Sequence, residues 1–155
     1  MTHLPPHPSA ATPELIAAFV AEWNRHPAMQ HMAARIDLSD PSVPRARIDH
    51  LQPYHRGGLG TDAVVGAVIA GMIDLVIGLT GYLQLQGQQV GVAQLNVNFL
   101  KPVRGTSLVA EGRPTRTGRR LVYVDARLSD DQGQLCATGS GIVAIAGAEA
   151  HAPSF

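Results

Sequence analysis

The stretch Ala63–Leu83, AVVGAVIAGMIDLVIGLTGYL, decides the fold of this chain. It is apolar on all sides, and Asp74 is its only ionisable side chain apart from Tyr82. Its length suffices to cross a bilayer, but an aspartate at the centre of a membrane helix costs about 2.5–3.5 kcal/mol. A helix that is apolar all round also occurs inside a domain, where other elements cover every face. We therefore expect a buried core helix, since a membrane span is further disfavoured by Gly66, Gly71, Gly78 and Gly81.

The pattern changes to that of β-strands after this stretch. Residues 90–100 alternate, with Val92, Leu95, Val97 and Phe99 set against Gln94, Asn96 and Asn98. Shorter strands are predicted ahead of the helix, over residues 32–38 and 45–51. Three more strands are predicted after it, over residues 107–113, 120–129 and 135–146, with short hairpin connections at Thr117-Gly118 and Asp131-Gln132-Gly133. A long helix followed by an antiparallel meander predicts an α+β fold.

The N-terminal region divides into a loose tail and one further helix. Residues 1–11 are rich in proline and are expected to form a flexible tail, and their His3 and His7 lack the ligand frame of a metal site. Thr12-Pro13 is a typical helix start, with Thr12 as the N-cap, and Pro27 ends the predicted helix. We expect residues 12–147 to form a single domain and residues 148–155 a C-terminal tail.

Composition excludes several classes of function. The chain has 155 residues, with 12 Lys and Arg against 12 Asp and Glu, so it lacks the positive charge of a nucleic-acid-binding protein. There is no basic amphipathic stretch for a membrane surface and no secretory signal pattern. The single cysteine, Cys136, cannot form an internal disulfide and is expected to pack in a strand. These features predict a cytoplasmic protein.

Three strings follow one another along the chain: Gly66–Asp74 (GAVIAGMID), Asn98–Gly105 (NFLKPVRG) and Gly118–Ala126 (GRRLVYVDA), the last followed by Asp131-Gln132-Gly133. In this order and spacing they resemble the hotdog-fold acyl-CoA thioesterases of the phenylacetate-degradation type, the PaaI-like family. The resemblance covers about residues 45–146 and implies an α+β hotdog fold, in which an antiparallel sheet wraps around a long central helix, here with an extra N-terminal helix.

The resemblance also implies two catalytic positions and a reaction. Asp74 corresponds to the family's helix carboxylate, which acts as general base or nucleophile on the thioester of a small or medium acyl-CoA. Gly66 corresponds to the backbone N–H that binds the oxyanion. Both roles agree with physical chemistry, because a helix N-terminus has free N–H donors and an apolar surround raises a carboxylate's pKa. The alternative for Asp74 is a carboxylate satisfied by a neighbouring backbone group or an Asn.

The chain departs from the family at Val65. Many relatives have a histidine nine positions before the acid, in a His-Gly-Gly string, and here the string is Val65-Gly66-Ala67. Val65 is then expected at the substrate, without the imidazole that orients the thioester. His55 or the pair Asn96 and Asn98 are candidates to contribute instead, although a polar strand face is commonly a solvent or interface face.

Coenzyme A enters only as part of the substrate, and no separate cofactor or metal is expected. The resemblance implies basic residues at its phosphates, and the candidates are Arg116, Arg119 and Arg120 around a glycine turn, with Lys101 and Arg104 as a second set. Arginine suits phosphate because its guanidinium forms a planar fork. The alternative is a solvated turn.

Two further expectations concern assembly and activity. The family pairs two subunits edge to edge with active sites at their boundary, so we expect a homodimer, which can pair again into a dimer of dimers. Hydrolysis has two alternatives: a non-catalytic acyl-thioester-binding protein, which Val65 favours, and a hotdog dehydratase or hydratase. The latter needs an Asp/His couple, and the sequence places no such histidine beside the helix.

Overall fold

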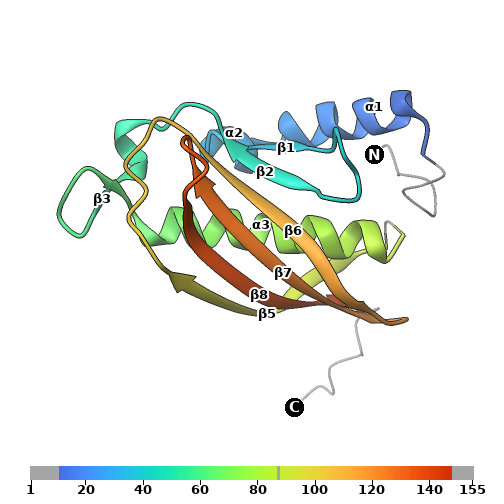
Figure 1. Ribbon diagram of the computed structural model, residues 1–155. Coiled ribbons are helices and arrows are strands. Elements are labelled where there is room, and N and C mark those ends of the chain that lie inside the picture. Colours follow the sequence, from blue (N-terminus) through green and yellow to red (C-terminus); the bar gives the residue numbers. More distant parts are fainter. Residues whose placement is uncertain (1–10, 87, 148–155) are drawn as a thin grey trace, which may run out of the picture.

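The computed structural model describes residues 11–86 and 88–147, so the predicted tails lie outside it except for Ala11, which packs against the core. A six-stranded sheet has the order β1-β2-β6-β7-β8-β5, and every neighbouring pair is antiparallel. The sheet curves around one long helix, α3 (Figure 1). The predicted hotdog architecture is therefore confirmed. The strands are β1 (Arg35–Asp37), β2 (Arg45–Ile48), β5 (Val90–Phe99), β6 (Leu108–Thr117), β7 (Leu121–Asp130) and β8 (Leu135–Ile145).

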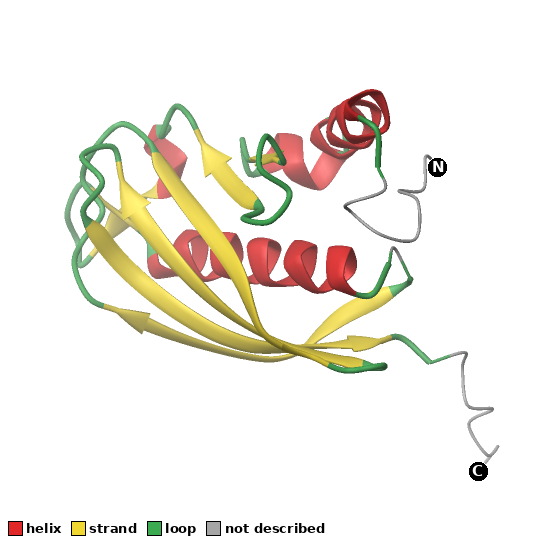
Figure 2. Cartoon of the chain, turned by 45° about the vertical axis from the view of Figure 1, so that its right-hand side comes forward, coloured by secondary structure: helices red, strands yellow, loops and turns green. Residues whose placement is uncertain are grey.

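The central helix α3 spans Gly66–Gln84. It is long and apolar enough to cross a membrane by length and composition, yet half of its most apolar window is buried within the fold. Figure 2 shows the sheet running beneath its whole length. The expectation of a core helix wrapped by a sheet is thus confirmed. The helix contributes several of the fully buried side chains of the core, including Met72, Ile73, Val76 and Ile77.

Ahead of α3 the structure adds elements that the sequence did not predict. Helix α1 (Pro13–Asn24) begins where Thr12 caps it, as predicted. It ends at Asn24, with Arg25 as its C-cap, and so stops short of Pro27, where the sequence predicted its end. Pro27 instead begins a second short helix, α2 (Pro27–His31), because proline suits the first helical position and His26 caps it. The glycine-rich region holds a one-turn helix, η2 (Pro53–His55), and a small hairpin, β3 (Arg56–Gly58) and β4 (Ala63–Val64).

Close approach of α3 to the sheet depends on glycine at a few positions. A Cβ atom added to Gly81 would lie 2.4 Å from Cβ of Val143, far inside van der Waals contact. Gly78, three residues earlier on the helix, would place its Cβ 3.5 Å from Cγ2 of Val92, an ordinary contact. Two glycines of one helix thus differ sharply in the room around them.

This difference predicts opposite effects on stability. Gly81→Ala is expected to lower the free energy of unfolding by about 1–3 kcal/mol, because the methyl forces α3 away from β8. The control is Gly78→Ala, which is expected to be neutral or to stabilise by up to about 1 kcal/mol through helix propensity. Urea denaturation of the two variants checks the comparison. Equal midpoints for Gly81→Ala and the wild type would contradict the packing described here.

Candidate active site

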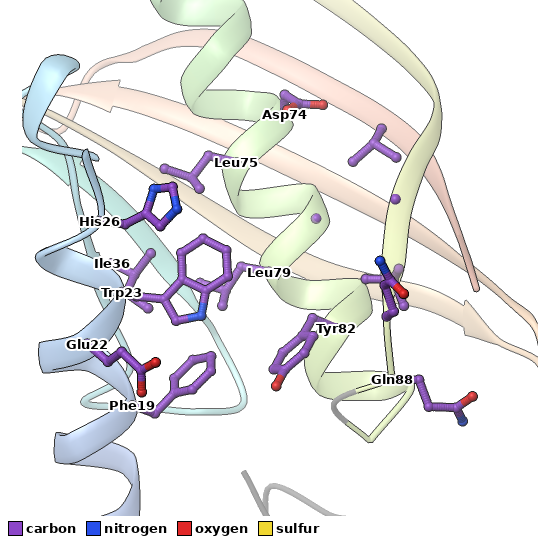
Figure 3. Close-up of a pocket in the computed structure, with 15 residues that line it drawn as sticks. Phe19, Glu22, Trp23, His26, Ile36, Asp74, Leu75, Leu79, Tyr82 and Gln88 are labelled. Carbon is purple, nitrogen blue, oxygen red and sulfur yellow. The ribbon is translucent and has the colours of Figure 1, made fainter. Parts of the chain in front are cut away.

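A cleft of about 710 Å³ lies between α1, α3 and the start of β5 (Figure 3). Asp74 lies toward one end of it, and Tyr82, two turns further along α3, lies toward the other. Helix α1 contributes Phe19 and Trp23 to the wall that faces α3. Most of the lining is apolar, and Asp74 and Glu22 are the two carboxylates among the residues that line it.

Asp74 has the properties of a reactive carboxylate. It is exposed in the single chain and makes no hydrogen bond or ion pair with any described residue. Burial against its apolar neighbours raises the pKa of the Asp74 carboxyl above the usual aspartate value of 3.8. A partly desolvated, unpaired carboxylate with a raised pKa accepts a proton more readily than an ordinary surface aspartate.

The N-terminus of α3 presents free backbone donors. Val65 is the N-cap and makes no side-chain capping bond. No acceptor within the described residues takes the N–H groups of Gly66 and Ala67, and both residues are exposed. The ring of Phe99, at the end of β5, lies against the position that a Gly66 side chain would occupy. Free N–H groups and the positive end of the helix dipole suit an oxyanion at this point.

One chain does not bring these two groups together on one carbonyl. Asp74 follows Gly66 by eight residues, and an α-helix rises 1.5 Å per residue, so the two lie about 12 Å apart along the axis. In thioester hydrolysis the Gly66 N–H would bind the carbonyl oxygen, and Asp74 would act on the carbonyl carbon. These two atoms belong to one small group. The separation of about 12 Å within one chain is larger than such a group spans.

His55 is held in the fold by both ring nitrogens. It is buried, its Nδ1 accepts the Gln52 N–H at 2.9 Å, and its Nε2 lies 3.0 Å from the carbonyl oxygen of Met32. The Gln52 N–H requires an unprotonated Nδ1, so Nε2 carries the proton and donates to Met32. The His55 carbonyl in turn accepts the Val65 N–H at 2.9 Å. This geometry gives His55 a structural role ahead of α3 and leaves neither ring nitrogen for a substrate.

Asn96 and Asn98 lie on the face of the sheet away from α3. Opposite residues in an antiparallel pair share a face, and Asn96 pairs with Ser140 while Asn98 pairs with Thr138. The alternate β8 residues, such as Gly139, approach α3 instead, since an added Cβ there would meet Ile73 at 2.4 Å. The two asparagines are therefore not brought to Asp74 or Gly66 of the same chain.

The two basic sets lie at opposite ends of α3. Arg116, Arg119 and Arg120 are exposed at the β6–β7 turn, beside the C-terminal end of the helix, where the Thr117 hydroxyl donates to Oε1 of Gln84 at 3.1 Å. These three arginines form no ion pair within the described part of the chain.

The second set lies near the N-terminal end of α3. Arg104 is already paired with Asp62 at 2.6 Å. Lys101, just past the end of β5, is exposed and makes no ion pair with any described residue.

The cleft contains residues that the sequence did not point to as a site. In the sequence, Phe19 and Trp23 are apolar residues of the predicted N-terminal helix and Tyr82 belongs to the core helix, and no motif marks any of them as part of a site. His26 shares the cleft with Asp74, but its Nδ1 accepts the Ala28 N–H at 3.3 Å as the cap of α2. Among the residues that the structure describes, no group of three or more His, Cys, Asp or Glu side chains is placed to hold a metal ion.

Comparison with known proteins agrees with the fold and the helix. Residues 62–137, close to half of the chain, match the family model of the thioesterase superfamily. Over these residues the chain is similar to the thioesterase superfamily. The match begins just before α3 and ends within β8, so it includes Gly66, Asp74 and the β5 edge.

Relatives named as esterases match it over short segments. One from Saccharolobus solfataricus is 41% identical over 49 residues, which is 32% of this chain and 33% of that protein. One from Thermoplasma acidophilum is 28% identical over 82 residues, which is 52% of this chain. The matches thus span only 33% and 61% of these two curated relatives.

Solved structures resemble this chain in fold over most of its length. A thioesterase-superfamily protein of Shewanella oneidensis gives a TM-score of 0.76 at 22% identity, covering 86% of this chain and 96% of that one. A Bacillus halodurans protein solved with CoA gives 0.73 at 22% identity, covering 91% and 99%. PaaI from E. coli, of the phenylacetic acid degradation operon, gives 0.71 at 15% identity, covering 82% and 89%. At these identities the likeness is one of fold.

Proposed function

We propose that this protein belongs to the thioesterase superfamily and hydrolyses the thioester of a small or medium acyl-CoA. The observation that carries the proposal is Asp74: an unpaired carboxylate with a raised pKa at one end of an apolar cleft, on the central helix of a thioesterase-superfamily fold. A carboxylate that lines an apolar cleft, has a raised pKa and lacks a charged or hydrogen-bonding partner is a candidate for a chemical role.

In the proposed reaction Asp74 acts as a general base. It takes a proton from water, the water oxygen attacks the thioester carbonyl, and the oxyanion accepts the Gly66 N–H of a second chain. The tetrahedral intermediate then breaks its C–S bond, and the departing thiolate receives the proton from Asp74. The products are the carboxylic acid and coenzyme A. Direct attack by Asp74, through a mixed anhydride that water hydrolyses, is the alternative route with the same residue.

The open edge of β5 supports assembly into a homodimer. This ten-residue strand pairs only with β8 among the described strands, and it contains no charged residue and no proline. Long, uncharged edge strands of this kind favour pairing with another chain. The opposite edge, β1, has three residues and carries the Arg35–Asp49 and Arg47–Asp37 ion pairs on and beside it. Antiparallel pairing of β5 with its copy brings two α3 helices together and can complete two sites; a dimer of dimers remains part of this proposal.

In this proposal Arg116, Arg119 and Arg120 bind the phosphates of coenzyme A. These three arginines are exposed at the β6–β7 turn and form no ion pair within the described part of the chain, so their guanidinium groups are free to bind an anion. The related Bacillus halodurans structure with CoA supports the ligand class.

The test of the proposed function is free-thiol release from a panel of short, medium-chain and aromatic acyl-CoAs. Turnover of at least one of them, proportional to protein concentration, is the expected result. If no substrate releases thiol although acyl-CoA binds, the protein is a binding module, the alternative that Val65 favours. Hydration of an enoyl-CoA without thiol release would instead make it a hydratase.

The raised pKa of Asp74 predicts a pH dependence. A general base must be ionised, so kcat/KM falls as the pH drops through the pKa of Asp74. Because burial raises that pKa, the acid limb is expected at a higher pH than an ordinary aspartate, with its value of 3.8, would give. A pH profile of kcat/KM measures the limb. An acid limb at or below the ordinary aspartate range would contradict this assignment of the base.

A further inference from the structure

The cleft beside Asp74 is elongated along α3. Tyr82 follows Asp74 by eight residues, so the cleft extends about 12 Å in this direction at 1.5 Å per residue. Figure 3 shows Trp23 and Leu79 between these two ends, on the facing sides of α1 and α3. A long apolar space that begins at a reactive carboxylate has the shape of an extended hydrocarbon chain.

Phe19 and Tyr82 form the far end of the cleft. Their rings stack with centroids 5.5 Å apart and an interplanar angle of 9°. Phe19 is buried, and its ring also lies 6.2 Å from that of Trp23. This aromatic contact joins α1 to α3, so the wall of the cleft depends on the N-terminal helix.

Gly78 keeps the passage open beside Asp74. It lies four residues after Asp74 and therefore on the same side of α3. An added Cβ there would be 3.5 Å from Cγ2 of Val92, so a methyl group fits. A longer side chain at this position would occupy the cleft between α3 and β5, and it would lean back toward Asp74 because helical side chains tilt toward the N-terminus.

We propose that this cleft is the acyl-chain pocket and that it selects unbranched, medium-length acyl chains, with Gly78 and Trp23 as specificity-determining residues. Gly78 sets the width of the pocket beside the reacting carbonyl. Trp23 forms the apolar wall along its length, and the Phe19–Tyr82 stack limits its depth. The choice of this cleft for the acyl group rests on the proposed function, which places the thioester carbonyl at Asp74.

The test uses S-alkyl-CoA thioethers, which have no carbonyl and are not hydrolysed. Each buried methylene strengthens binding about fourfold, so S-octyl-CoA is expected to bind at least about a hundredfold more tightly than S-ethyl-CoA. S-tetradecyl-CoA is expected to gain nothing over S-octyl-CoA, because the aromatic stack closes the pocket. Trp23 is the only tryptophan of the chain, so its fluorescence reports occupancy of the cleft directly. S-octyl-CoA is expected to shift its emission to shorter wavelength, and S-ethyl-CoA to leave it unchanged.

Gly78→Leu and its matched control Gly78→Ala test the residue assignment by calorimetric titration. The leucine is expected to reduce the octyl-over-ethyl preference to less than about tenfold while S-ethyl-CoA binds within about twofold of the wild type. The alanine is expected to keep the wild-type preference. The proposal is overturned if the two thioethers bind equally, if Trp23 emission does not respond to the octyl chain, or if Gly78→Leu leaves the preference intact.

Hydrolysis and chain selection can fail separately. Chain-dependent thioether binding without any thiol release from acyl-CoA would support the pocket and overturn the hydrolase. Thiol release without chain-dependent binding would support the hydrolase and overturn the pocket.

Discussion

Replacing Asp74 by asparagine is expected to lower kcat for thiol release at least about a hundredfold, the low end of what a general base contributes. The amide has nearly the same shape as the carboxyl group but cannot accept a proton from water. Because burial raises the pKa of Asp74 above its unfolded value, ionisation at neutral pH costs more in the folded state. The free energy of unfolding of Asp74→Asn at pH 7 is therefore expected to equal or exceed that of the wild type.

The matched control for this variant is Asp125→Asn. Asp125 is exposed on β7 and pairs with Ser140, on the sheet face away from α3. Its replacement is expected to leave kcat within about twofold of the wild type, since surface substitutions have small effects. Steady-state thiol release by both variants, with urea denaturation alongside, makes the comparison. Equal turnover by Asp74→Asn and the wild type would remove Asp74 from the mechanism.

Gly66→Pro is the second variant with a large expected effect. Proline lacks the N–H that we assign to the oxyanion and suits the first position of a helix, which Gly66 occupies. Val65 already has the extended backbone that a residue before proline adopts, with φ −66° and ψ 143°. Loss of one oxyanion donor lowers kcat by about 10²–10³, so we expect a decrease of this size in a protein that still folds.

Gly66→Ala separates the donor from the space around it. Alanine keeps the N–H and adds only a methyl, which would lie 3.4 Å from the Phe99 ring. It is expected to retain activity within several-fold of the wild type, as measured by kcat for thiol release, because the donor is unchanged. If alanine and proline reduce kcat equally, the side-chain space at this position matters and the N–H does not.

Much of the fold could be predicted from local pattern. The uniformly apolar Ala63–Leu83 stretch indicated a core helix, and α3 is that helix. The alternation of β5 was also predictable, including its one irregularity. The sequence pattern placed Val92 and Leu95 on one face although they are three residues apart. In the structure a bulge between Val92 and Gln94 produces this spacing. The interior strands followed from alternation and hairpin turns in the same way.

The candidate site was only partly predictable, because it depends on contacts between distant segments. No local pattern shows that Trp23 on α1 faces the same cleft as Asp74 on α3. His55 looked like an available imidazole, whereas both its nitrogens bond to backbone groups from two separate segments. The polar alternation of Asn96 and Asn98 was clear, but only the register with β8 shows that this face turns away from α3.

The measurement that tests the shared site most directly is the thiol release of mixed oligomers made by co-expressing Asp74→Asn and Gly66→Pro chains with different affinity tags. Each homodimer lacks one required group in both sites. In a mixed dimer, one site joins the native Asp74 of one chain to the native Gly66 of the other. Random pairing then predicts recovery to about a quarter of wild-type activity, because half of the dimers are mixed and each has one intact site. A mixture no more active than its two parents would contradict a site formed by Asp74 and Gly66 of different chains.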